Sequence, residues 1–147
     1  MSATVTSVNL SAKKTVRKTP GTEGTLVVGS GFEGDAHAGD WHRQVSLLAE
    51  ESIERMREKG LDVHAGDFAE NITTQGIDLV ALPVGTRVRV GDTLLEVSQI
   101  GKVCHTKCAI YYQAGDCVMP REGIFAIVIE GGPVRVGDTV RVEGDEG

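Results

Sequence analysis

Short stretches in which apolar and polar residues alternate recur along the chain and predict a protein built mainly from β-strands. Valine is frequent in these stretches and glycine separates them, as expected for strands joined by tight turns. The pattern places strands at residues 5–10, 25–28, 43–47, 68–73, 87–90, 93–98, 124–129 and 139–143.

One segment, residues 48–59, instead has the pattern of an amphipathic helix. Ser46 is the expected N-cap, because its hydroxyl can accept a hydrogen bond from an unpaired backbone N–H. Gly60 is expected to end the helix in the left-handed conformation. The residues expected to form its buried stripe are Leu48, Ser52, Ile53 and Met56.

A hexapeptide at residues 88–93 recurs letter for letter at residues 134–139. Each copy reads as a short strand, a Gly-Asp turn and a second strand, and such turns suit hairpins because they tolerate positive φ. The repeat therefore predicts two related hairpins in a β-barrel.

Length and charge narrow the class of protein. The chain has 147 residues, which suits one domain, expected at residues 1–143 with a loose tail at 144–147. A net charge of −6 argues against general nucleic-acid binding, although the basic residues 13–18 could hold a small anion. No apolar run is long enough for a membrane span, and three cysteines do not suggest a disulfide framework. We expect a cytoplasmic protein.

Cys104 is the best candidate for reactive chemistry. It follows a strand-like apolar run and a glycine, and Lys102, His105 and Lys107 are close in sequence. Neighbouring positive charge favours the thiolate, which is both the nucleophile and the soft metal ligand. The other cysteines, Cys108 and Cys117, are interpreted as buried and inert, although together with Cys104 and His105 they leave a zinc site open.

A second repeated motif offers another candidate metal site. The sequence His-Ala-Gly-Asp at residues 37–40 recurs at residues 64–67, and each copy is followed by an aromatic residue. Histidine and aspartate can bind metals, but the tight ligand spacing of structural zinc sites is absent. Surface histidines in loops are the simpler interpretation.

Several segments resemble, in order, the MOSC domain, which is named from the C-terminal part of molybdenum cofactor sulfurase. One of these segments is Val8-Asn9-Leu10-Ser11, and a later one is Gly34-Asp35-Ala36-His37-Ala38-Gly39. Cys104 falls where this family has its characteristic cysteine. The remaining matching segments are residues 13–14, 43–47, 66–73, 76–79, 85–97 and 123–125.

This resemblance implies a mainly β, barrel-like fold with one main helix and short helical turns. It also implies a role with the molybdenum cofactor (molybdopterin), in which Cys104 holds a persulfide or ligates molybdenum. The implied partners are a cysteine desulfurase or other sulfur donor and a molybdoenzyme client, with no nucleic acid and no membrane. A pyridoxal-phosphate domain is not expected in this chain. The residues expected to line the cofactor site are Lys14, Asp35, His37, Arg43, Gln44 and Asn71.

Three hypotheses about function follow. In the first, a stand-alone MOSC protein binds the molybdenum cofactor or molybdenum, carries sulfur on Cys104 for delivery to a molybdenum centre, or does both. In the second, the protein is a non-catalytic module that binds and delivers the cofactor. In the third, it is a small zinc-binding protein that uses the cysteines. The sequence leaves open whether Cys104 supports an enzymatic activity, either sulfur transfer or a molybdenum-dependent reaction.

Overall fold

The computed structural model describes residues 3–11, 19–35, 38–41, 44–58, 60, 62–66, 70–100 and 123–143. Strands dominate these residues, with one α-helix and one turn of 3₁₀ helix. Within them, no helix is long and apolar enough to cross a membrane. The elements in chain order are β1 (Ala3–Leu10), β2 (Thr19–Gly21), β3 (Glu23–Val27), β4 (Gly31–Phe32), β5 (Val45–Ala49), α1 (Glu50–Glu58), β6 (Ile72–Gln75), η1 (Leu79–Ala81), β7 (Arg87–Val90), β8 (Thr93–Ile100), β9 (Ile124–Glu130), β10 (Gly132–Arg135) and β11 (Thr139–Val142).

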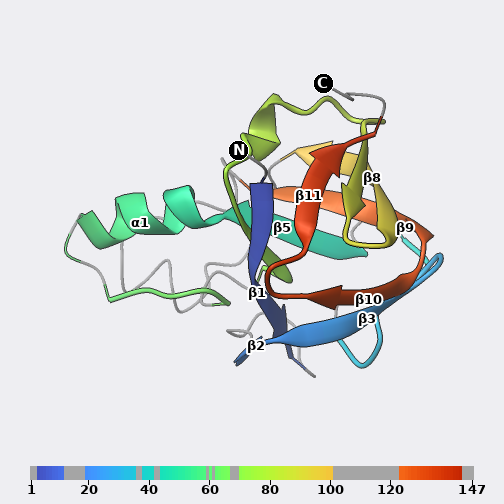
Figure 1. Ribbon diagram of the computed structural model, residues 1–147, viewed down its shortest axis with the longest axis horizontal. Helices are drawn as coiled ribbons and strands as arrows, with labels where there is room; N and C mark the ends of the chain where they lie inside the picture. The colour runs from blue at the N-terminus through green and yellow to red at the C-terminus, as the bar shows by residue number, and fades with distance from the viewer. Residues whose placement is uncertain are drawn as a thin grey trace.

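The main sheet closes into a barrel (Figure 1). Its described strands follow the order β11-β7-β8-β9-β5-β6-β1, and β1 pairs with β11 to complete the ring, while β2 adds to β1. Neighbours in the ring are antiparallel except β5 and β6, which are parallel. A parallel pair needs a crossover connection, and α1 lies on that connection. The mainly β, barrel-like fold with one helix is thus confirmed.

Alternating side chains fill the barrel. Val8 of β1, Leu47 of β5 and Ile124 of β9 belong to one buried apolar cluster. A second sheet, in the order β10-β3-β4, adds Phe32 and Val134 to the same cluster. Figure 1 shows β3 and β10 side by side below the barrel strands. One core therefore joins the two sheets.

One row of register partners crosses five neighbouring strands. It runs from Ile100 in β8 to Ile124, then to Leu47, Ile72 and Val8. Since β5, β6 and β8 run in the same direction, their carboxyl ends meet at one end of the barrel. We call this the helix end, because α1 begins there, directly after β5.

The helix prediction was wrong at its start. The expected start was residue 48, with Ser46 as N-cap, but α1 begins at Glu50 and Ser46 lies inside β5. The strand continues because Leu48 pairs with Thr73 of β6. The predicted stripe of Ser52, Ile53 and Met56 is buried, and Gly60 has the predicted positive φ of 89°.

Only the first copy of the repeated hexapeptide forms a hairpin, so the prediction of two hairpins was wrong. The first copy joins β7 to β8 as an antiparallel pair. In the second copy, β10 pairs with β3 and β11 pairs with β7 and β1. Backbone N–H groups of this turn donate outside it, from Val136 to Thr22 O and from Gly137 to Val5 O. The second turn is therefore a corner between two sheets.

The other expected strands agree with the structure to within a few residues where it describes them. The strand expected at 43–47 lies at β5, and the one expected at 68–73 is described from Ile72 as β6. Two short strands, β2 and β4, were not predicted. Both are too short for alternation to be recognised.

Candidate functional site

The outer face of β1, β6 and β5 is polar and yet buried. Asn9, Ser46 and Thr73 follow or precede core residues in their strands, so their side chains point away from the barrel interior. Glu70 and Asn71, directly before β6, are both 0% exposed. We call this surface the polar wall, which consists of Ser7, Asn9, Ser46, Glu70, Asn71 and Thr73.

A chain of hydrogen bonds connects four residues of the polar wall. Ser7 Oγ donates to Asn9 Oδ1 at 2.6 Å, and Asn9 Nδ2 donates to Thr73 Oγ1 at 3.0 Å. Thr73 Oγ1 in turn donates to Glu70 Oε2 at 3.0 Å. Buried polar groups are costly unless hydrogen-bonded, and a buried carboxylate is the most costly of these. The chain therefore fixes the orientation of Asn9 and Thr73 relative to Glu70.

Asn71 joins three strands through its side chain and backbone. Its Oδ1 accepts hydrogen bonds from Ser46 N and Ser46 Oγ at 3.0 and 3.2 Å, and its Nδ2 donates to Asn9 O at 3.2 Å. Its backbone N–H donates to Ser46, and its carbonyl accepts from Asn9 N at 2.7 Å. Asn71 thus clamps β1 and β5 at the start of β6. Its expected contact with a cofactor stays a prediction.

Asp35 and Gln44 are also buried and also bind the backbone. Asp35 Oδ1 accepts from Ser11 N at 3.0 Å, directly after β1. Gln44 Oε1 accepts from Val128 N of β9 at 2.9 Å. These two residues lie on either side of the sequence that contains His37 and Arg43. They act as anchors for both ends of that segment.

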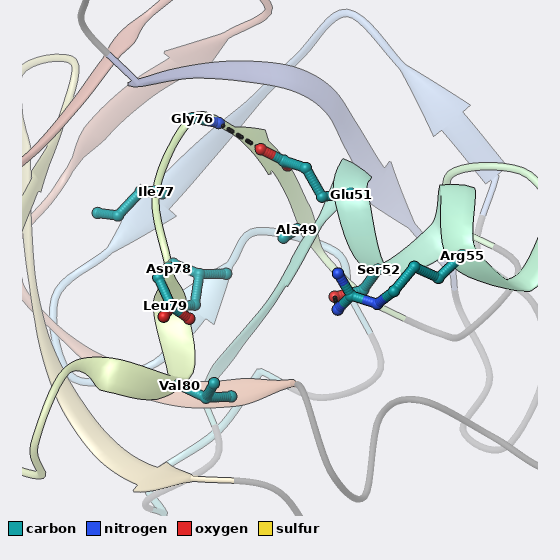
Figure 2. Close-up of a pocket in the computed structure, with 9 residues that line it drawn as sticks. All are labelled: Ala49, Glu51, Ser52, Arg55, Gly76, Ile77, Asp78, Leu79 and Val80. Atoms are coloured by element: carbon teal, nitrogen blue, oxygen red, sulfur yellow. Dashed lines mark hydrogen bonds between the residues drawn. The ribbon is translucent and has the colours of Figure 1, made fainter.

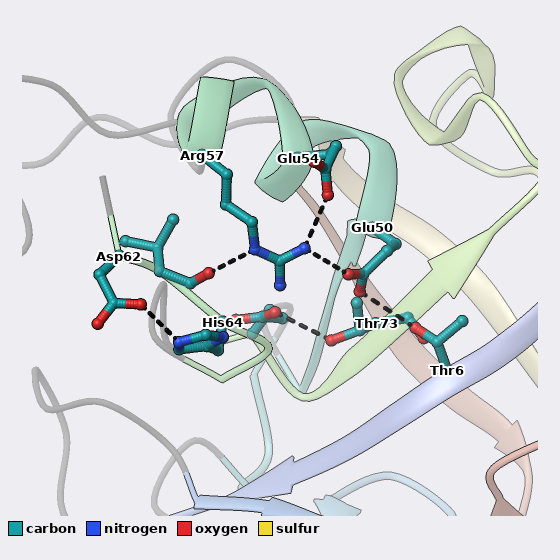
Figure 3. A network of polar contacts seen from close by, with 9 residues as sticks. Thr6, Glu50, Glu54, Arg57, Asp62, His64 and Thr73 are labelled. Carbon is teal, nitrogen blue, oxygen red and sulfur yellow. Dashed lines mark hydrogen bonds and ion pairs between the residues drawn. The ribbon is translucent and has the colours of Figure 1, made fainter. Parts of the chain in front are cut away.

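The side of α1 near the polar wall is held by Arg57 (Figure 3). Its Nη1 binds Glu54 at 2.8 Å and Glu50 at 3.3 Å, and its Nε donates to Val63 O at 2.8 Å. The hydrogen bond with Glu54, followed by the charge of Glu50, raises the pKa of Arg57 despite partial desolvation. Thr6 Oγ1 of β1 reaches Glu50 Oε2 at 3.5 Å. The helix is thereby tied to β1 and to Val63.

The comparisons with known proteins agree with this architecture. A family model for the MOSC domain matches residues 34–141. The chain belongs to the MOSC domain family. A search of curated proteins found no match.

Several solved structures have the same fold as this chain. The YuaD protein of Bacillus subtilis aligns with a TM-score of 0.76 and 19% identity, over 97% of this chain and 96% of that one. YiiM of Geobacillus stearothermophilus aligns with a TM-score of 0.71 and 20% identity, over 95% and 74%. YiiM of Escherichia coli aligns with a TM-score of 0.70 and 22% identity, over 99% and 71%. At these identities the likeness establishes the fold.

Several predicted site residues of this MOSC protein lie outside the described residues. They are Lys14, His37, Arg43 and Cys104, together with Cys108, Cys117 and His105. Of the second His-Ala-Gly-Asp copy, His64 is exposed, and its Nε2 is 2.9 Å from Asp62 Oδ1 (Figure 3). In the part of the chain that the structure describes, no group of three His, Cys, Asp or Glu side chains could hold a metal.

Sequence reasoning missed most of the polar wall of the MOSC barrel. Ser7, Thr73 and Glu70 were not singled out, because polar residues at alternate strand positions usually face water. Ser46 was assigned to a helix cap instead. The available signal was the pair Glu70-Asn71 directly before an apolar strand residue, within a segment already recognised as MOSC-like.

Proposed function

We propose that this MOSC protein binds the molybdenum cofactor or molybdenum, and that Cys104 carries sulfur for delivery to a molybdenum centre. One observation supports this most strongly. The described residues of the expected cofactor site, Asp35, Gln44 and Asn71, are all buried anchors of backbone next to the expected ligand-binding segments. A protein that must hold loops in one arrangement around a ligand needs such anchors.

The residue types fit the cofactor. Lys14 follows Ser11 by three residues, and Arg43 directly precedes Gln44, so both cations are next to anchored positions in the sequence. Arginine suits a phosphate because its planar fork donates two hydrogen bonds at once. The Cys104 thiolate is a soft ligand that suits molybdenum. When bound, the cofactor would supply a molybdenum centre able to exchange oxygen or sulfur ligands.

The chain is long enough to bring Cys104 to the polar wall. Ile100 is the last described residue before Cys104, and it shares a register row with Ile72, which follows Asn71. Three strand spacings of about 4.8 Å separate Ile100 from Ile72, or about 14 Å. The four residues from Ile100 to Cys104 can span up to about 14 Å. Covalent geometry therefore permits one site that includes both Cys104 and the polar wall.

In the sulfur-carrier role, the Cys104 thiolate would attack the terminal sulfur of a persulfide on a donor such as a cysteine desulfurase. A new S–S bond forms on Cys104, the donor S–S bond breaks, and the donor leaves as a thiolate, so no oxidant is needed. The client would be a molybdoenzyme. A reactive thiol of this kind suits a reducing compartment, so we also propose a cytoplasmic location.

Intact-protein mass spectrometry without reductant, with elemental analysis for molybdenum, tungsten and zinc, tests this proposal. We expect an added mass of about 32 Da per sulfur that reductant removes, or bound molybdenum. Either should be lost in Cys104→Ala and kept in the matched controls Cys108→Ala and Cys117→Ala. Sulfur or molybdenum that persists in Cys104→Ala would contradict a role for this residue.

Two other results would favour the alternatives. A protein with no modification and no metal, which still binds the pterin cofactor as well in Cys104→Ala as in the wild type, would indicate a non-catalytic delivery module. Zinc near one per chain, lost in Cys108→Ala or Cys117→Ala, would indicate a zinc-binding protein.

A further inference from the structure

A cavity of about 530 Å³ lies at the helix end of the barrel, between α1 and the residues that follow β6. Ala49, Glu51, Ser52 and Arg55 line one side, and residues 76–80 line the other (Figure 2). We call it the helix pocket. Its volume is in the range of about 300–1,000 Å³ that is usual for small-molecule sites.

The walls of the helix pocket are fixed. Glu51 Oε2 accepts a hydrogen bond from Gly76 N at 2.9 Å, which joins the two walls at one edge (Figure 2). Ala49 and Ile77 pack against the barrel core, and Leu79 belongs to it. The pocket therefore does not depend on a movement of α1 to form.

Charged side chains line both walls, with Glu51 and Arg55 on α1 and Asp78 on the other. On α1, the Arg55 guanidinium donates to Ser52 Oγ at 3.3 Å. On the other wall, Asp78 precedes η1, but its side chain makes no capping hydrogen bond to that turn. A ligand that carries only one sign of charge would meet a like charge on one wall.

The remaining lining is apolar. Ala49, Ile77 and Leu79 form part of it, and Val80 is 37% exposed at its edge. A hydrocarbon body placed here would cover Val80 and remove apolar surface from water. The pocket thus combines an apolar surface with one cation, Arg55, and two anions, of which Glu51 is bound to Gly76 N and Asp78 lies on the opposite wall.

We propose that the helix pocket binds a small zwitterion with an apolar body, of the type of an apolar amino acid. Its carboxylate would bind Arg55, its ammonium group would bind Asp78, and its side chain would contact Leu79 and Val80. This proposal uses no residue of the proposed cofactor site. It therefore stands or falls separately from the role of Cys104.

Three probes that share one skeleton test the charge pattern. They are L-phenylalanine, 3-phenylpropanoate, which lacks the amine, and 2-phenylethylamine, which lacks the carboxylate. Binding is followed on the full-length protein by the amide NMR shifts of Gly76, Ile77 and Asp78. We expect phenylalanine to bind with a Kd of about 1 mM. Each single-charge analogue should bind about five-fold more weakly, since each exposed ion pair contributes modestly.

Variants assign each charge to its wall. Arg55→Gln should weaken phenylalanine and 3-phenylpropanoate about five-fold but should not weaken 2-phenylethylamine, which loses a like charge on that wall. Asp78→Asn should weaken phenylalanine and 2-phenylethylamine to a similar extent but should not weaken 3-phenylpropanoate, which loses a like charge on that wall. The matched controls are Arg87→Gln and Asp92→Asn, two charged residues in and beside the β7–β8 hairpin, outside the pocket lining. They should change none of the three affinities.

A third variant tests the pocket without altering charge. Val80→Trp, at a partly exposed position of the lining, should fill the space and abolish the shifts while the rest of the spectrum shows a folded barrel. The proposal is overturned if none of the probes shifts residues 76–78, or if binding is unchanged in Arg55→Gln, Asp78→Asn and Val80→Trp.

Discussion

Replacing Asn71 by alanine should destabilise the barrel far more than a typical polar substitution. The change removes the acceptor of Ser46 N and the donor to Asn9 O. Both are buried backbone groups, and leaving such a group unsatisfied costs about 2 kcal/mol. We therefore expect the free energy of unfolding to fall by about 4 kcal/mol. This is a large part of the total of about 5–15 kcal/mol that is typical of single domains.

The measurement is urea unfolding followed by circular dichroism, with the slope of the transition compared between variants. Gln75→Ala is the matched control, because Gln75 is an exposed residue of β6, the strand that Asn71 directly precedes. Its effect should stay within about 0.5 kcal/mol. If Asn71→Ala unfolds at the same urea concentration as Gln75→Ala, the assignment of Asn71 as a clamp is refuted.

A double-mutant cycle tests the partner. In a Ser46→Ala background, the Ser46 Oγ contact with Asn71 is already gone, so Asn71→Ala should cost less than in the wild type. Coupled residues typically show interaction energies of about 0.5–3 kcal/mol. Strict additivity would mean that the two side chains do not support one another.

Three further changes test the fold. Leu47→Ala, in the middle of the register row, should lower the free energy of unfolding by about 3 kcal/mol, and an unchanged Tm in calorimetry would contradict its place in the core. Gly91→Ala should cost about 1–2 kcal/mol by thermal unfolding, because Gly91 has a φ of 58° and an added Cβ would lie 2.5 Å from Asp138 Oδ2; no loss would contradict this close approach of Gly91 to Asp138. Arg57→Gln should cost about 1 kcal/mol through the lost bond to Val63 O. Because the folded-state pKa of Arg57 is raised above its ordinary value, its stabilisation is complete below that ordinary value and is lost only as pH rises through the folded pKa. The cost measured by urea unfolding should thus be equal at about pH 6 and about pH 9, and a difference would refute this origin.

Alternation identified most strands because one face of the barrel is apolar. In β8, Leu95 and Val97 face the core in the pattern that the sequence predicts. The start of α1 was misplaced because Leu48 satisfies both a helix stripe and a strand. In the structure, Leu48 is part of β5 and is buried although its side chain points away from the barrel interior. From the sequence alone, a buried residue at this position is expected to belong to the helix. Strand pairing decides this case, and pairing is not visible in a local window.

The repeated hexapeptide also shows that strand pairing decides a structure that the local sequence leaves open. Identical sequences at residues 88–93 and 134–139 form a hairpin in one place and a corner between sheets in the other. Local preference for a turn at Gly-Asp is satisfied in both. The difference lies in which strand is available as a partner, β8 in the first case and β3 in the second.

The candidate site contains two kinds of polar residue that sequence alone does not distinguish. Sequence selects polar residues near strand ends, but a ligand contact and a buried anchor have the same residue types. The side chains of Asn71 and Gln44 form hydrogen bonds with backbone groups of the protein itself, so their substitution would reduce cofactor binding through loss of structure. Arg43 provides the contrast. If it binds the cofactor phosphate, Arg43→Gln should weaken binding about 10- to 100-fold while the free energy of unfolding changes by less than about 0.5 kcal/mol. Asn71→Ala should lower both quantities, and equal behaviour of the two variants would place Arg43 among the anchors.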